Sequence, residues 1–190
     1  MENRNLKINI KDIDMGTIDE ESFGESLLAC FPKIDEFCES IDSKINFMAM
    51  ISFIPYSNSM AQYNDIIENM EIKNQLLELR RTVKLWSKGL TSKQKKLYHE
   101  YFVKNNTRKY QQERRYEYRR NLDILPMVRQ FMWHLRLVSI CDEKSLIKNP
   151  YIYRMYSIIK RRNEHIRNCG FAYKKGERNH DSSTNEKRNP

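Results

Sequence analysis

Apolar residues in the middle of the chain recur at alternating intervals of four and three positions, and this spacing constrains the fold more than any other feature. On a helix, such spacing gathers side chains into a narrow stripe that packs against another helix. It predicts a helix over about residues 63–88, whose stripe serves either as the core of a helical bundle or as the seam of a dimer. The stripe consists of Ile66, Met70, Ile72, Leu76, Leu79, Val83, Trp86 and Leu90.

A second apolar stripe precedes the first and predicts a partner helix over about residues 33–54. Pro55 ends this helix, and the polar residues that follow it suit a short loop. The two helices therefore pair antiparallel within one chain or pair across a dimer. Residues 1–21 are polar and acidic, and we expect a loose arm there. The second stripe consists of Ile34, Cys38, Ile41, Ile45 and Met48.

The helical pattern continues beyond this acidic N-terminal region, which spans residues 1–90. Thr91 and Gln94 fit a capping box, in which each side chain bonds the backbone of the other residue. This motif predicts a short helix that ends near Lys104. Pro126 predicts the start or a kink of another helix, because proline is tolerated in the first turn of a helix and disrupts its interior.

The last predicted helix begins at Asn149 and ends at Gly170, since glycine favours the C-terminal cap of a helix. Residues 91–172 thus form a second, basic helical domain. After Tyr173 apolar residues cease, and we expect residues 173–190 to form a disordered tail. No segment indicates a sheet, so the sequence predicts an all-α fold.

Charge divides sharply along the chain. Residues 1–78 contain 6 Lys or Arg against 15 Asp or Glu, a net charge of −9. Residues 79–190 contain 28 against 10, a net charge of +18. A field this positive suits a polyanion such as nucleic acid, although an acidic protein or lipid surface also satisfies it. The acidic half suits self-association or contact with a partner protein, RNA polymerase among them.

The densest group of basic side chains lies on a predicted helix that begins at the N-cap Thr107. This helix either continues unbroken to Arg120 or is followed by a turn at residues 121–123. Guanidinium groups bind phosphates or guanine, and tyrosine hydroxyls donate to phosphate oxygens. The alternative is a solvated basic face whose tyrosines pack in the core. The candidate nucleic-acid-binding residues are Lys93, Lys96, Arg108, Lys109, Arg114, Arg115, Tyr116, Arg119 and Arg120.

A second basic run, Lys160-Arg161-Arg162 with Arg167, either contacts nucleic acid as well or neutralises the acidic half. The acidic cluster Asp19-Glu20-Glu21 fits a solvated loop better than a pair of catalytic acids. The sequence contains no glycine-rich phosphate loop, zinc-protease motif or nucleophile elbow. None of its four histidines has a metal-ligating residue at a suitable spacing. We therefore expect no catalytic site, no metal and no cofactor.

Residues 1–11 contain no apolar run typical of an export signal. The longest apolar stretch, residues 47–54, is too short to span a bilayer. The four cysteines are widely spaced and form no CxxC pair. We therefore expect a cytoplasmic protein without membrane contact, whose cysteines are buried and reduced.

The order of these parts resembles a known group of proteins. The stretch LLELRRTVKLWSKGLTSKQKKLYHEYFVKNNTRKYQQERRYEYRR contains a long helix, a Gly-Leu break, a capped helix and a basic segment. The amphipathic segment DILPMVRQFMWHL follows. This order is similar to that in small phage transcriptional regulators of the ArpU/RinA type, over about residues 34–138. Their C-terminal part is similar to the helix-turn-helix domain with which sigma factors read promoters.

The resemblance implies an antiparallel helical pair that leads into a basic helix-turn-helix-like domain. It implies binding to duplex DNA in a phage promoter region and control of late or packaging genes. Arg108, Arg115 and Arg119 would make the primary DNA contacts, and Lys93, Lys96 and Lys109 would contact phosphates.

Two further classes of function remain open on the residues alone. The first is RNA binding, because exposed tyrosines near arginines stack on unpaired bases. Against it, Tyr98, Tyr101, Tyr153 and Tyr156 recur at the spacing of a helical core. The second is a non-enzymatic interaction or inhibitor protein whose basic face docks on an acidic partner.

Overall fold

The computed structural model describes residues 18–52, 59–104 and 120–181, with side chains in the last helix described as far as Asn168. Every regular element in these ranges is helical, and none is a strand. The predicted all-α fold is therefore confirmed.

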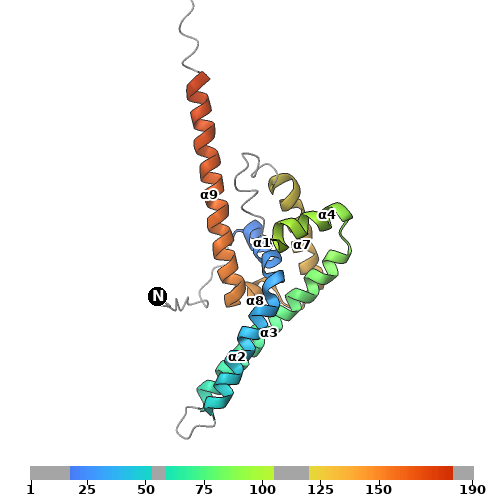
Figure 1. Ribbon diagram of the computed structural model, residues 1–190, viewed down its shortest axis with the longest axis vertical. Coiled ribbons are helices and arrows are strands. Elements are labelled where there is room, and N and C mark those ends of the chain that lie inside the picture. The colour runs from blue at the N-terminus through green and yellow to red at the C-terminus, as the bar shows by residue number, and fades with distance from the viewer. Residues whose placement is uncertain (1–17, 53–58, 105–119, 182–190) are drawn as a thin grey trace, which may run out of the picture.

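The two striped helices form an antiparallel pair within one chain, as Figure 1 shows. They are α2 (Ile34–Ser52) and α3 (Ser59–Lys88). Leu76, Leu79 and Val83 are fully buried, and Trp86 and Leu90 are nearly so. Because the chain's own helices fill this stripe, it is bundle core and not the seam of a dimer. Met70 was wrongly assigned to the stripe, since 52% of it is exposed.

A helix that the sequence did not predict, α1 (Glu20–Cys30), lies at the centre of the molecule (Figure 1). Phe23, Leu27 and Leu28 are buried in the core, and a 3-10 turn at Phe31–Lys33 joins α1 to α2. The acidic cluster that begins at Asp19 is therefore not a solvated loop. It opens a helix, where carboxylates offset the partial positive charge of the helix N-terminus.

The start of the basic domain follows the sequence prediction closely. Thr91 caps α4 (Ser92–Tyr98) in a capping box. The backbone N–H of Gln94 donates to Thr91 Oγ1 at 3.3 Å, and the backbone N–H of Thr91 donates to Gln94 Oε1 at 2.9 Å. A π-helical turn, His99–Val103, continues α4.

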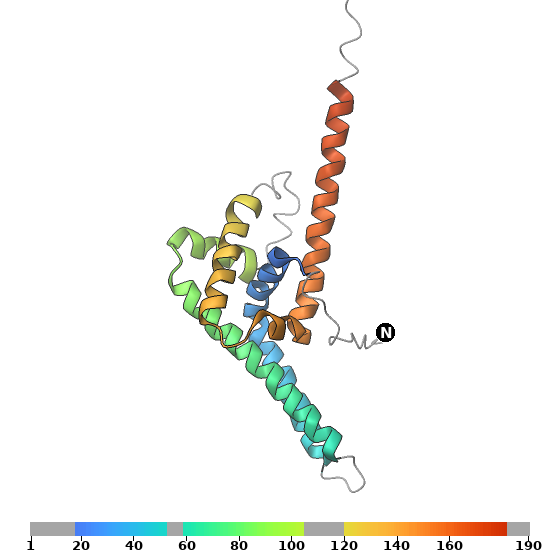
Figure 2. The ribbon, with the colours of Figure 1, turned by 180° about the vertical axis from the view of Figure 1, so that it is seen from behind.

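Two long helices complete the body, and α1 packs between them (Figure 2). They are α7 (Leu125–Val138), with Pro126 in its first turn, and α9 (Pro150–Asp181). A π-helical turn, Arg120–Ile124, leads directly into α7. The alternative of a turn between helices at residues 121–123 is therefore wrong. Continuous helix over 108–119 lies outside the described residues.

The connection from α7 to α9 contains a short helix that the sequence did not predict, α8 (Glu143–Lys148), capped by the Asp142 side chain. The last helix is longer than expected. It passes Gly170, the predicted cap, and continues to Asp181, into the predicted disordered tail. Residues 182–190 of that tail lie outside the described ranges.

One hydrophobic core joins the acidic and basic regions. Trp86 of α3 packs edge-on against Tyr98 of α4 at 5.8 Å between ring centroids, and against Phe131 of α7 at 5.2 Å. The core therefore crosses the boundary expected at residues 90 and 91. Among the described residues, no helix is both long and apolar enough to cross a bilayer.

Candidate nucleic-acid interface

The capped helix α4 presents a group of exposed lysines, which we call the lysine surface. All four of its members are exposed. They are Lys93, Lys95 and Lys96 on α4, and Lys104 directly after the π-helical turn His99–Val103. No ion pair joins any of them to another described residue. Lys95 was expected to flank the candidate contacts, whereas Lys104 was not among them, although it lies in the same basic part of the sequence.

The aromatic residues of this region pack in the core beneath α4 and do not face solvent. Tyr98, Tyr101 and Phe102 are at most 8% exposed and belong to the core. Their spacing arises because they lie on the inner side of α4 and its π-helical turn, opposite the lysines. Tyr156 is likewise buried and Tyr153 half-buried. The prediction that these four tyrosines have core spacing is confirmed, and it removes them as base-stacking platforms.

Arg120, a candidate DNA contact, lies in the interior. Only 5% of it is exposed, and its Nε donates to Glu25 Oε1 at 2.6 Å. Glu25, on α1, is itself fully buried and also accepts from Arg162 of α9. Because both guanidinium groups are committed to one carboxylate, Arg120 is not part of an exposed binding face. Its assignment as a nucleic-acid contact is wrong.

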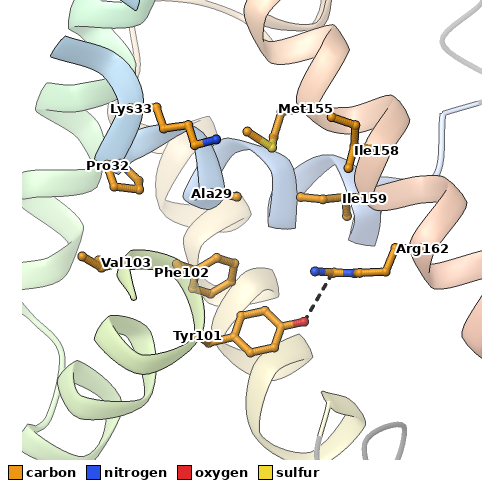
Figure 3. Close-up of a pocket in the computed structure, with 10 residues that line it drawn as sticks. All are labelled: Ala29, Pro32, Lys33, Tyr101, Phe102, Val103, Met155, Ile158, Ile159 and Arg162. Carbon is orange, nitrogen blue, oxygen red and sulfur yellow. Dashed lines mark hydrogen bonds between the residues drawn. The ribbon is translucent and has the colours of Figure 1, made fainter. Parts of the chain in front are cut away.

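Further polar contacts surround Glu25. Arg162 donates to the Tyr101 hydroxyl at 3.3 Å, a bond drawn in Figure 3. The neighbouring Asn163, also buried, donates to Ser22 Oγ at 2.9 Å. These contacts satisfy polar groups that would be costly to bury unpaired.

Three more arginines pair with the start of α1 and its N-cap. Arg129 bonds Glu21 at 2.7 Å and Arg136 bonds Glu20 at 2.5 Å, both from α7. From α9, Arg167 bonds Asp19 at 3.3 Å. The hydrogen bonds of Arg136 to Glu143 and Glu20 raise the pKa of its guanidinium group above the ordinary value, so the group stays charged.

The acidic start of α1, with its N-cap Asp19, therefore docks on the basic half of the chain. Of the second basic run, Arg162 and Arg167 neutralise α1, as one of the two alternatives predicted, and Arg161 is exposed. The signal for this docking was present in the sequence. Acidic residues at 19–21 precede Phe23, Leu27 and Leu28, which is the pattern of a capped helix with one apolar face.

A cavity of about 590 Å³ lies between α1, the π-helical turn His99–Val103 and α9 (Figure 3). Its wall is mostly apolar and includes Phe102, Met155 and Ile159, with Lys33 and Arg162 as its two cations. No group of His, Cys, Asp or Glu among the described residues could hold a metal ion.

The cysteines that the structure describes are free thiols. Cys30 and Cys38 are buried and Cys141 is half-buried, and burial raises the pKa of each thiol. The side chain of Cys169 lies outside the described residues. The other candidate contacts, which are Arg108, Lys109, Arg114, Arg115, Tyr116 and Arg119, lie there too.

Lys93 and Lys96 are thus the predicted contacts that the structure places on one exposed surface. Comparison of the chain with models of protein families, with curated proteins and with solved structures found no match in any of the three.

Proposed function

We propose that the protein is a DNA-binding transcriptional regulator that contacts duplex DNA through its basic helical region. The lysine surface binds the phosphate backbone. In this proposal the adjoining residues Arg108, Lys109, Arg114, Arg115, Tyr116 and Arg119 extend the contact. The resemblance to phage late regulators suggests the class of target, a promoter region.

The observation that carries the proposal is the contrast between two kinds of cation. The arginines at positions 120, 129, 136, 162 and 167 all bond carboxylates of the acidic N-terminal half. The lysines of α4 bond no described carboxylate and are exposed together. Their charge is therefore available to a polyanion, while the charge of those arginines is neutralised within the protein.

The chemistry of lysine indicates the kind of contact. An ammonium group is a compact charge on a flexible stem, which suits phosphate oxygens better than the paired acceptors of a base edge. We therefore expect the lysine surface to contribute affinity and salt dependence, and to contribute little sequence preference. Sequence preference would come from the arginines of the adjoining segment.

The test measures fluorescence anisotropy of a labelled random duplex with the full chain across a salt series. About six phosphate contacts predict a slope of about −5 for log K against log salt. Replacing Lys93→Gln and Lys96→Gln should flatten that slope by about 1.8, because each lost contact removes about 0.9.

The matched control is Lys144→Gln with Lys148→Gln, which removes the same charge from exposed positions on α8. Its slope should remain near that of the unmodified protein. Equal flattening of the slope in both variants would show that the lysine surface contributes to binding only through the net charge of the protein. Absence of binding at about 50 mM salt would exclude direct DNA recognition.

A further inference from the structure

The cavity between α1, the π-helical turn His99–Val103 and α9 is larger than a packing defect. Protein interiors are close-packed, and few of their voids exceed the size of a water molecule. An apolar void of about 150 Å³ is already enough to hold a small aromatic molecule. At about 590 Å³, this cavity is in the range of pockets that bind small molecules. Its volume is therefore sufficient for a small-molecule ligand.

Most of the cavity wall is hydrocarbon, and part of that wall is in contact with water. Phe102 of the π-helical turn and Ile159 of α9 are buried there, whereas Val103 is 37% exposed and Ile158 is 50% exposed. Figure 3 shows that the π-helical turn and α9 supply these side chains from different sides of the cavity. A ligand with a hydrocarbon chain would remove the exposed part of the wall from water, which is favourable.

The charged side chains of the cavity all have the same sign. Among the described residues that line it, Lys33 and Arg162 are cations and none carries a carboxylate. A concave surface lined by charges of one sign attracts ligands of the opposite sign. The ligand that suits this cavity is therefore an anion.

The two cations differ in whether the protein already compensates their charge. Arg162 bonds the buried Glu25 and also donates to the Tyr101 hydroxyl at 3.3 Å. Lys33 is exposed, and no ion pair joins it to another residue that the structure describes. In Figure 3 its side chain extends from the 3-10 turn toward the interior of the cavity, which Ala29 also lines. The charge of Lys33 is therefore available to a ligand.

We propose that the cavity binds a small amphipathic carboxylate, with its hydrocarbon chain against the apolar wall and its carboxylate at Lys33. A lysine ammonium group is a compact point charge, which suits a single carboxylate. A phosphate group is matched less well, because tight phosphate binding uses several donors and the guanidinium group of Arg162 is committed to Glu25. The cavity is separate from the lysine surface, so this proposal does not depend on DNA binding.

The first test is isothermal titration calorimetry of the full chain with decanoate, at concentrations below those at which it forms micelles. We expect one saturable site with a Kd below about 1 mM. Decyltrimethylammonium has a hydrocarbon chain of the same length and the opposite charge, and it should bind at least about tenfold more weakly. Equal affinity for the two compounds would contradict a site for anions. Absence of saturable decanoate binding would overturn the proposal.

Lys33→Gln tests the contact with the carboxylate. It should weaken decanoate binding about threefold to fivefold, as expected for the loss of a partly exposed ion pair. It should not weaken the binding of decyltrimethylammonium, and equal loss for both compounds would contradict a role for the lysine charge. The matched control is Lys84→Gln, which removes the same charge from an exposed position on α3. Equal weakening of decanoate binding in both variants would remove Lys33 from the site.

Ile158→Glu tests the apolar wall independently of Lys33. It places a carboxylate beside the hydrocarbon chain of the ligand, so decanoate binding should fall at least about tenfold. Because Ile158 is half exposed, the midpoint of urea unfolding should change little. Leu137→Glu is the control, since Leu137 is exposed on α7, which does not line the cavity. Undiminished decanoate binding by Ile158→Glu would exclude the cavity as the site.

NMR spectra of the full chain with labelled isoleucine methyl groups locate the ligand directly. Decanoate should shift the signals of Ile158 and Ile159 and leave that of Ile140 in place. Ile140 is 81% exposed and lies elsewhere, where its backbone N–H bonds Glu78 of α3. Equal shifts at Ile140 would show that decanoate coats exposed apolar surface without selecting the cavity, and would refute the proposal. None of these measurements includes nucleic acid, so their failure and the failure of DNA binding are distinguishable.

Discussion

Gly24 of α1 lies against Val128 of α7 so closely that a β-carbon on Gly24 would be 2.6 Å from Val128 Cγ1. The same β-carbon would be 2.8 Å from Met132 Cγ. The absence of a side chain at Gly24 therefore sets the distance at which the two helices pack. Because α1 carries the carboxylates that pair with the arginines of α7 and α9, this contact also positions the ion pairs.

Replacing Gly24→Ala should lower the free energy of unfolding by about 1–3 kcal/mol, because overpacking outweighs the better helix propensity of alanine. Val128 is β-branched and has little rotamer freedom to move aside. Urea unfolding measures the effect. Adding Val128→Ala should cost less in the Gly24→Ala background than in the unmodified protein.

Gly89→Ala provides the control for this substitution. A β-carbon there would meet only the Trp86 carbonyl oxygen, at an ordinary 3.5 Å. We expect an effect near zero, or stabilisation of up to about 1 kcal/mol from reduced freedom of the unfolded chain. Similar losses at Gly24 and Gly89 would mean that close helix packing is not the cause.

Replacing Glu25→Gln should be among the most destabilising polar substitutions. It leaves Arg120 and Arg162 with one neutral acceptor in the interior, and breaking a buried ion pair costs about 3–5 kcal/mol. Glu21→Gln is the comparison, because its partner Arg129 is 69% exposed and such pairs contribute about 0–1 kcal/mol. Denaturant unfolding of both variants checks the prediction, which equal losses would contradict.

Cys30 should make stability depend on pH in the alkaline range. Burial raises the pKa of its thiol from 9.0 to about 12, so the native state keeps a proton that the unfolded state loses. The stabilisation is complete below pH 9.0 and is lost as pH rises toward 12, at up to about 1.4 kcal/mol per unit. Burial also raises the pKa of Tyr98, which acts in the same direction.

The comparison of the unmodified protein with Cys30→Ala isolates the thiol, because the contribution of Tyr98 is common to both. Unfolding free energies measured between pH 8 and 11 should converge as pH rises. A constant difference between the two proteins would show that the Cys30 thiol does not titrate differently on unfolding.

Thr91→Ala should destabilise α4 by about 1 kcal/mol, because Thr91 Oγ1 accepts from the Gln94 amide and alanine cannot. Thr91→Ser keeps the oxygen and should retain most of that stability. The loss should be visible as faster hydrogen exchange of the first amides of α4. Identical exchange in the alanine and serine variants would show that the cap is not what holds the helix start.

The sequence predicted the helices whose apolar stripes are long, because regular spacing over several turns is hard to produce by chance. It predicted the cap of α4 for a different reason, since Thr91 and Gln94 interact across only three positions. It missed α1, whose apolar face is short and whose acidic start is typical of loops as well. It also missed α8, which has only six residues.

The candidate site was harder to predict than the fold, because charge in a sequence does not say which charges meet. Arg120 ends the basic run of the sequence, yet it bonds Glu25 from 95 positions away. A contact of that separation depends on how α1 and α7 pack. Lys93 and Lys96 could be placed on the surface because the apolar positions of α4 are local and leave them on its outer side.

The buried Glu25 also fixes the two chain positions that flank the basic segment 105–119. Tyr101, before the segment, bonds Arg162, while Arg120, after it, bonds the same carboxylate that Arg162 does. The folding of the protein therefore already offsets the conformational-entropy cost of bringing these two positions together. That cost grows with the logarithm of the number of residues between them. A free peptide with the sequence of this segment would start with its ends apart. A polyanion that binds the free peptide must offset this entropy cost from its own binding free energy. In the intact protein the cost has already been met by folding.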